Sequence, residues 1–158
     1  MIGFDGSPAA RRALREAAAL FAPRRALVVV VWEAGYAFDL ADLPTRLLES
    51  PPTTVDIRTA MQLDESMYDA AQQLAERGAA TAAEGGLDAE GLAVADDITV
   101  ADTLVRVARE RNAQVLVVGA HGHSAWREVL LGSTSREIVH RAPCPALVVR
   151  AEEKPKAH

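Results

Sequence analysis

The sequence lacks features that mark several large classes of protein. Only one of its 158 residues is a cysteine, so the chain can form no internal disulfide and no cysteine-based metal site. A single thiol is typical of proteins kept in a reducing compartment, and we expect a cytoplasmic protein. The longest aliphatic run, from Ala26 to Val31 and closed by Trp32, is too short to span a bilayer, and the sequence shows no signal-peptide pattern. We therefore expect no membrane association.

Excess basic charge is also lacking. The formal net charge is -5 at pH 7, so no basic stripe is available to neutralise phosphates, and we expect no nucleic-acid binding. A nucleotide pocket is still compatible with this charge, because backbone N–H groups bind phosphate without lysine or arginine. Neither Gly-x4-Gly-Lys-Ser/Thr nor Gly-x-Gly-x2-Gly occurs, which excludes the P-loop and the dinucleotide-binding fingerprint.

Short apolar runs alternate with helical patterns along the chain. Strands are predicted at residues 1–5, 26–32, 91–95, 115–118 and 146–149. Amphipathic helices are predicted at 8–22, at 60–84, after a cap at Thr99 with Val100 and Leu104 facing inward, and from 133 onward. This alternation predicts an α/β fold: a five-stranded, largely parallel, doubly wound sheet with helices on both faces. We expect one domain over residues 1–150, with an irregular loop insertion at 33–59 and a flexible polar tail at 151–158.

The most informative stretch joins the fourth predicted strand to the last helix. The apolar run Val115–Val118 ends at Gly119, with Gly122 three positions later. Gly132 follows after nine more residues, and Ser133 then opens a helical pattern. Glycines let a ligand approach the backbone closely, and a helix N-terminus offers unpaired N–H groups and partial positive charge to a phosphate. The alternative is an ordinary strand-to-helix turn, which also tends to contain glycine and serine.

The full pattern Gly-x2-Gly-x9-Gly-Ser resembles the ATP-binding motif of the universal stress protein family. The segment GSTSREIVHRAPCPALVVR is similar to the family's closing segment, and FDGSPAARRALREAA is similar to its opening strand, turn and first helix. The middle of the chain resembles the family less. The resemblance implies an adenine-nucleotide alpha-hydrolase-like fold and a regulatory protein of the stress response that binds ATP, with or without Mg²⁺. The alternative function is that of a relative without useful ATP affinity, which works as a protein-interaction module.

The resemblance also implies which residues hold the nucleotide. Asp5 matches the acid that holds the ribose hydroxyls, and Val31 matches the position whose backbone meets the adenine. The remaining candidates for the nucleotide site are Phe4, Gly6, Gly119, Ala120, His121, Gly122, Gly132, Ser133, Thr134 and Ser135. For Asp5 a second role is equally open from the residues themselves, since an aspartate before Gly-Ser often caps the turn that leads into a helix. Ser7 is the predicted cap of that helix, with Pro8 in its first turn.

Two other polar motifs invite a chemical role. His121 and His123 flank a glycine, as in some nucleotidylyl transferases, but they follow the wrong strand for that motif, and we interpret them as exposed loop residues. In the family this loop often carries an arginine; here Arg127 or a bound Mg²⁺ would have to compensate the phosphate charge. Asp96 and Asp97 are adjacent and point in different directions, so we interpret them as solvated loop acids and predict no metal site.

The resemblance to the family also bears on partners and catalysis. The apolar segment Ala146–Val149 is the last predicted strand, and the resemblance implies that it pairs with its own copy to form a homodimer. An exposed edge strand of this apolar character would otherwise invite unwanted pairing. A protein partner is expected, and its identity is not encoded in any motif. The site offers no general base beyond its histidines, so we predict no catalytic residue and at most slow ATP hydrolysis.

Overall fold

The structure is a computed structural model that describes residues 1–34, 54–120 and 132–150. The predictions for most of the 33–59 loop, for His121, Gly122, His123 and Arg127, and for the tail at 151–158 concern residues outside these ranges. Within the described ranges, no helix is both long enough and apolar enough to cross a membrane.

Five parallel strands form a single sheet, as the sequence predicts. The strands are β1 (Ile2–Gly3), β2 (Arg25–Trp32), β3 (Asp88–Ala95), β4 (Leu116–Gly119) and β5 (Ala146–Val149). Their order in the sheet is β3-β2-β1-β4-β5, and every neighbouring pair is parallel. Because the chain first builds outward in one direction and then in the other, the order reverses between β1 and β4.

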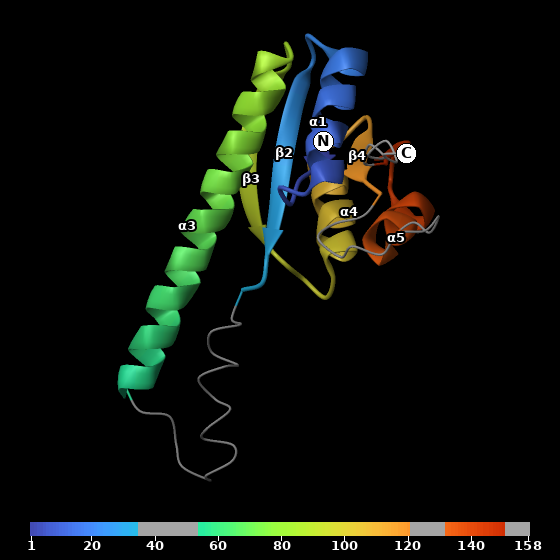
Figure 1. Cartoon of the computed structure of the whole chain (residues 1–158). Helices are drawn as coiled ribbons and strands as arrows, with labels where there is room; N and C mark the ends of the chain where they lie inside the picture. The colour runs from blue at the N-terminus through green and yellow to red at the C-terminus, as the bar shows by residue number, and fades with distance from the viewer. Residues whose placement is uncertain (35–53, 121–131, 151–158) are drawn as a thin grey trace, which may run out of the picture.

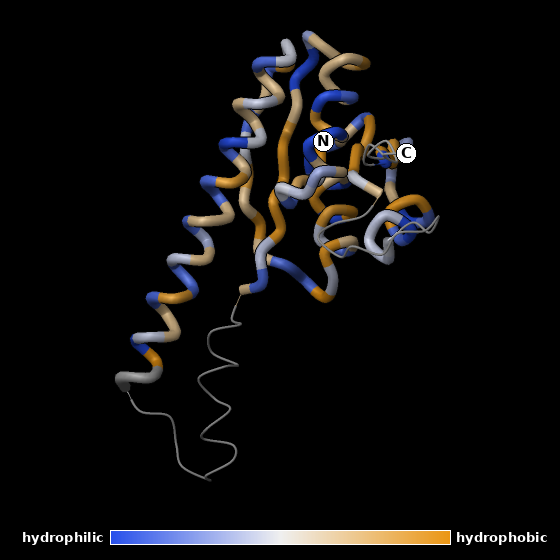
Figure 2. The backbone as a smooth tube through the Cα atoms, in the orientation of Figure 1, coloured by the Kyte–Doolittle hydropathy of each residue, from blue (hydrophilic) through white to orange (hydrophobic). Residues whose placement is uncertain are grey.

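Four helices of the described ranges cover the two faces of the sheet (Figure 1). They are α1 (Pro8–Phe21), α3 (Thr54–Glu84), α4 (Val100–Glu110) and α5 (Ser133–Arg141). One buried cluster joins α1 and α3 to Val28 and Val30 of β2, and a second joins α4 and α5 to Val29. Successive side chains of a strand point to opposite faces, so the valine run of β2 supplies both clusters. Figure 2 shows this strand as an apolar path between the helices.

Two elements begin at least three residues before their predicted starts, and β1 covers two of the five residues predicted for it. Helix α3 begins at Thr54, six residues before the predicted start and inside the stretch expected to be loop. Its first turn contains threonine, valine and isoleucine, whose helix propensity is low, and a long helix extends through such residues when its other turns are favourable. Strand β3 begins at Asp88, three residues early, because it pairs with β2 continuously from Arg25↔Asp88 to Trp32↔Ala95. The pairing overrides the weak strand propensity of its first residues.

Small residues let the helices lie close to the sheet. The buried faces of α1 and α3 are built largely from alanine: Ala10, Ala13, Ala17, Ala18, Ala71, Ala75, Ala79 and Ala82. Gly91 of β3 shows how close the approach is, since a Cβ atom added there would lie 2.6 Å from the backbone carbon of Ala75. The packing of this face therefore depends on the absence of side-chain volume at the contact.

An ion pair joins the two helices on the other face. The carboxylate of Asp102, in the first turn of α4, accepts a hydrogen bond from the hydroxyl of Thr99 at 2.7 Å and pairs with Arg141 of α5. Thr99 is the predicted cap of α4, and its hydroxyl also accepts a hydrogen bond from the Asp102 N–H. The hydrogen bonds from Thr99 and then Arg141 lower the pKa of Asp102 below its ordinary value of 3.8.

We expect Asp102→Asn to lower the melting temperature at neutral pH and to matter less in acid. A carboxylate whose pKa is lowered by folding stabilises the protein above its unfolded pKa, and this contribution is lost as pH falls through the folded value. The difference in melting temperature between wild type and variant should therefore shrink below pH 3.8. Thermal unfolding followed by circular dichroism measures it, with Asp69→Asn on the exposed face of α3 as the control. A difference that stays constant into acid would contradict the role assigned to the carboxylate charge.

Candidate ligand-binding site at the carboxyl ends of the strands

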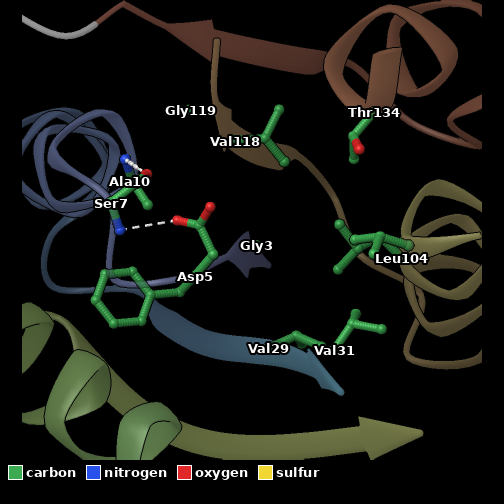
Figure 3. Close-up of a pocket in the computed structure, with 12 residues that line it drawn as sticks. Gly3, Asp5, Ser7, Ala10, Val29, Val31, Leu104, Val118, Gly119 and Thr134 are labelled. Carbon is green, nitrogen blue, oxygen red and sulfur yellow. Dashed lines mark hydrogen bonds between the residues drawn. The ribbon is translucent and has the colours of Figure 1, made fainter. Parts of the chain in front are cut away.

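A cavity of about 200 Å³ opens where the strand order reverses (Figure 3). In doubly wound sheets ligands bind at this place, beyond the carboxyl ends of the strands. The cavity draws residues from β1, β2 and β4 and from the first turns of α1, α4 and α5. Its lining residues are Gly3, Phe4, Asp5, Ser7, Ala10, Val29, Val31, Val100, Leu104, Val118, Gly119 and Thr134.

The turn between β1 and α1 presents the acid. Gly6 has a φ of +76°, a conformation that favours glycine, and the Asp5 carboxylate accepts a hydrogen bond from the Ser7 N–H at 2.9 Å. The Ser7 hydroxyl in turn accepts from the Ala10 N–H at 3.1 Å and caps α1, with Pro8 in the first turn as predicted. Both roles considered for Asp5 are therefore compatible, because its carboxylate braces the turn while lining the cavity. Gly6 shapes the turn and is absent from the lining.

Gly119 packs against the first turn of α1. A Cβ atom at this position would lie 2.8 Å from the Ala10 nitrogen and 2.9 Å from the Ala9 Cβ. A Cβ atom essentially never makes non-bonded contacts this short, so any other residue would push the helix away from β4. The sequence predicts that Gly119 lets a ligand approach the backbone; in the structure its missing side chain lets the first turn of α1 approach. It also brings the N-terminus of α1 to the edge of the cavity, which Gly119 itself lines.

The peptide groups of Ala120 tie three elements together. The Ala120 N–H donates to the carbonyl of Val149, at the end of β5, at 2.7 Å. The Ala120 carbonyl accepts the N–H of Gly132 at 2.9 Å and the hydroxyl of Ser135 at 2.9 Å. The last two of these bonds join the end of β4 to the start of α5, and so bring the first and last parts of the glycine motif together.

The first turn of α5 contributes one side chain to the cavity. Thr134 lines it, whereas Ser133 is exposed and Ser135 is buried with its hydroxyl turned to the backbone. Gly132 is the cap residue of α5 and makes no side-chain capping bond. Ser135, predicted as a ligand residue, is thus not brought into the cavity. His121 and Gly122 lie outside the described residues.

The end of β2 offers backbone groups on the cavity side. The Phe4 N–H donates to the Val29 carbonyl, whereas the Trp32 carbonyl accepts from Asp96 on the opposite side of the strand. Residues in a parallel strand alternate in this way, so the N–H and C=O of Val31 point toward the side of β1, beyond the point where β1 ends. The backbone of Phe4 belongs to this edge, while its ring packs against Gly78 of α3.

One wall of the cavity is apolar, and the sequence did not identify it as part of a site. Val100 and Leu104 of α4 face Val29 and Val118 of the sheet. Their helical spacing predicts inward-facing positions; Leu104 is 3% exposed, as predicted, whereas Val100 is 42% exposed. The pattern does not distinguish a core position from a cavity wall. In Figure 3, Leu104, Thr134 and Asp5 point toward the same space from α4, α5 and the end of β1.

Electrostatics distinguish the two sides of the cavity. Helices α1, α4 and α5 all begin next to it, which directs the positive ends of three helix dipoles toward it. Asp102 lies in the first turn of α4, whereas the first turns of α1 and α5 contain no acid. The Asp5 carboxylate lies beside the start of α1, where it accepts from the Ser7 N–H, so the start of α5 is the more favourable place for an anion.

The described residues show no grouping of three histidine, cysteine or acidic side chains that would hold a metal ion. Asp97 pairs with Arg106 at 2.8 Å, and this bond together with those to Glu110 raises the pKa of the arginine. Asp96 accepts a hydrogen bond from the Ala34 N–H at 3.3 Å. The two adjacent acids are thus engaged with different partners on the surface, in agreement with their interpretation as loop acids.

The sheet order and the cavity at its switch point define a doubly wound α/β domain. The sequence model of the universal stress protein family matches residues 1–150. The chain therefore belongs to the universal stress protein family, as its end segments predicted.

Individual relatives agree in fold. The universal stress protein YxiE of Bacillus subtilis (strain 168) is 25% identical over 150 residues, which cover 95% of this chain and 97% of that protein. A family protein from Arabidopsis thaliana with AMP bound has a TM-score of 0.62 at 18% identity, covering 96% of this chain and 90% of its own. The universal stress protein from Archaeoglobus fulgidus in complex with dAMP has a TM-score of 0.62 at 19% identity, covering 94% of each chain. These structural relatives bind adenine nucleotides.

We expect Gly119→Ala to destabilise the protein by about 1–3 kcal/mol, because the new methyl group meets backbone atoms of α1 that cannot move aside independently. Urea unfolding measures the change. Ser133→Ala, at an exposed position of α5, is the control and should stay within about 0.5 kcal/mol of wild type. An unchanged midpoint for Gly119→Ala would show that α1 is not held at the distance described.

Proposed function

We propose that the protein binds ATP in this cavity and acts in the cytoplasm as a nucleotide-dependent regulatory protein of the stress response. The observation that supports this most is the convergence of a carboxylate, an apolar wall and a helix N-terminus in one cavity at the switch point. Each matches one part of a nucleotide: the sugar, the base and the phosphates. The adenine nucleotides of the structural relatives agree with this choice of ligand class.

The charges suggest how the ligand lies. The ribose hydroxyls donate to Asp5, and the adenine edge meets the N–H and C=O of Val31 while its ring contacts the apolar wall. The phosphates lie toward the N-terminus of α5, at Gly132, Ser133 and Thr134, because the first turn of this helix contains no acid. With the opposite orientation the phosphates would lie beside Asp102, at the start of α4.

Binding, and not turnover, is the activity that we propose. Among the described lining residues Asp5 is the one carboxylate, and its hydrogen bond to the Ser7 N–H holds it in the turn. Metal ions have no acidic cluster to hold them in the described part of the chain, so Mg²⁺ would enter with the phosphates. The nucleotide then changes the contacts that the protein makes with its own copy or with a protein partner.

Gly132→Val tests the phosphate end of the site. The purified wild-type protein should release about one ATP per subunit on denaturation, detected by mass spectrometry, and should bind ATP with Mg²⁺ in a calorimetric titration. The isopropyl group of the variant covers the uncapped start of α5, so binding should be lost. Val139→Ala, on an exposed position of the same helix, is the control and should bind as wild type does. If the wild type releases no nucleotide and gives no heat at millimolar ATP, the proposal fails, and an interaction module without ATP becomes the better hypothesis.

We propose further that the chain forms a homodimer through β5 (Ala146–Val149). The sheet has two edges, and the one at β3 is covered by Gln72 of α3, whose side chain accepts from the Ala93 N–H at 3.0 Å and donates to the Gly91 carbonyl at 3.4 Å. The other edge is β5, a strand of apolar residues. An edge of this kind favours pairing with a second copy.

Val148→Pro tests the dimer without breaking the sheet. The carbonyls of Pro145 and Val149 accept hydrogen bonds from Leu116 of β4 and from Ala120 just after it, so by alternation the backbone of Val148 points to the outer edge. A proline there removes a donor from the outer edge alone. Light scattering should show a dimer for wild type and for Val148→Thr, which keeps the N–H, and a monomer for Val148→Pro. A dimer that survives the proline would place the interface elsewhere.

A further inference from the structure

The buried hydroxyl of Ser135 donates a hydrogen bond to the carbonyl of Ala120, 15 residues earlier in the chain. Ser135 is 2% exposed, and its Oγ lies 2.9 Å from the Ala120 carbonyl oxygen and 3.0 Å from that of Gly132. The contact with Gly132 is the local back-bond that a serine commonly makes within a helix. The contact with Ala120 is different, since it crosses from the first turn of α5 to the end of β4.

The acceptor of this bond is itself fixed. Ala120 is 1% exposed, its N–H is bonded to the Val149 carbonyl, and its own carbonyl also accepts the Gly132 N–H. Two donors from the start of α5 therefore converge on one buried oxygen of the sheet. Two bonds from neighbouring turns determine both the position and the direction of the helix start, whereas the Gly132 bond alone leaves the helix able to pivot.

We infer that Ser135 is a positioning residue: its hydroxyl holds the start of α5 so that Gly132, Ser133 and Thr134 meet the phosphates. This rests on the proposed nucleotide site and assigns to Ser135 a role other than ligand contact. Removing the hydroxyl leaves the Ala120 carbonyl with one donor and lets the start of α5 move. Backbone N–H groups bind a phosphate well only when they are aimed at it. Asp5 lies in the turn after β1 and Val31 lies in β2, and neither takes part in this bond.

The test compares a ligand with phosphates and a ligand without them. Calorimetric titration of Ser135→Ala should show ATP binding weakened roughly tenfold, the loss expected for one buried hydrogen bond, with adenosine affinity unchanged. Thr103→Val is the matched control. Thr103 is a fully buried hydroxyl in the first turns of α4, where it donates to the Thr99 carbonyl and accepts from the Asp97 N–H. Its loss should lower stability and leave the affinities for ATP and adenosine as in wild type.

The selective loss of ATP affinity is the decisive result, because general destabilisation weakens both ligands alike. Equal loss for ATP and adenosine, or no loss for either, would overturn the positioning role while the wild type still binds ATP. A wild type that binds neither ligand would overturn the proposed function itself, and the positioning role with it. The two failures are thus separated by the wild-type titration.

Discussion

The rest of the structure depends on the absence of side-chain volume at the end of β4. At Gly119 there is no room for even a methyl group, because the first turn of α1 lies directly against the strand. That contact places the capped start of α1 beside the end of β1 and so determines where the Asp5 turn lies. One residue further, the Ala120 peptide joins β5 and α5 to the same point. The core and the site are therefore assembled by two consecutive small residues.

The valine run of β2 likewise contributes to both the core and the cavity. Val28 is fully buried beneath the alanine faces of α1 and α3, whereas Val29 and Val31, on the opposite face, line the cavity with Leu104. A strand covered on both faces needs no polar alternation, which explains its uniform sequence. The carboxyl end of the same strand then projects past β1, where its backbone is directed to the cavity side. One strand thus contributes to both the core and the cavity.

The two helices that begin on either side of the cavity, α4 and α5, differ in charge at their first turns. The helices on its two sides begin with different chemistry: the first turn of α4 carries Asp102, paired with Arg141, while α5 begins at a glycine without a side-chain cap. The pair between Asp102 and Arg141 also ties α4 to α5 across the same side of the sheet. The buried Ser135 hydroxyl adds a second tie, from the start of α5 to the Ala120 carbonyl at the end of β4.

The sequence by itself determined the order of the elements, the parallel sheet, the caps at Ser7 and Thr99 and the family, because period, capping and end motifs are local signals. It also indicated Asp5, Val31, Gly119 and Thr134, which the fold brings to one cavity. Only the tertiary structure decided that Leu104 lines the cavity and that Gly119 packs against the first turn of α1. It also decided that the Ser135 hydroxyl bonds to the Ala120 carbonyl. It likewise decided that α3 begins at Thr54. These outcomes depend on which residues meet across the fold, and a buried position has the same local pattern whether it faces the core or a cavity.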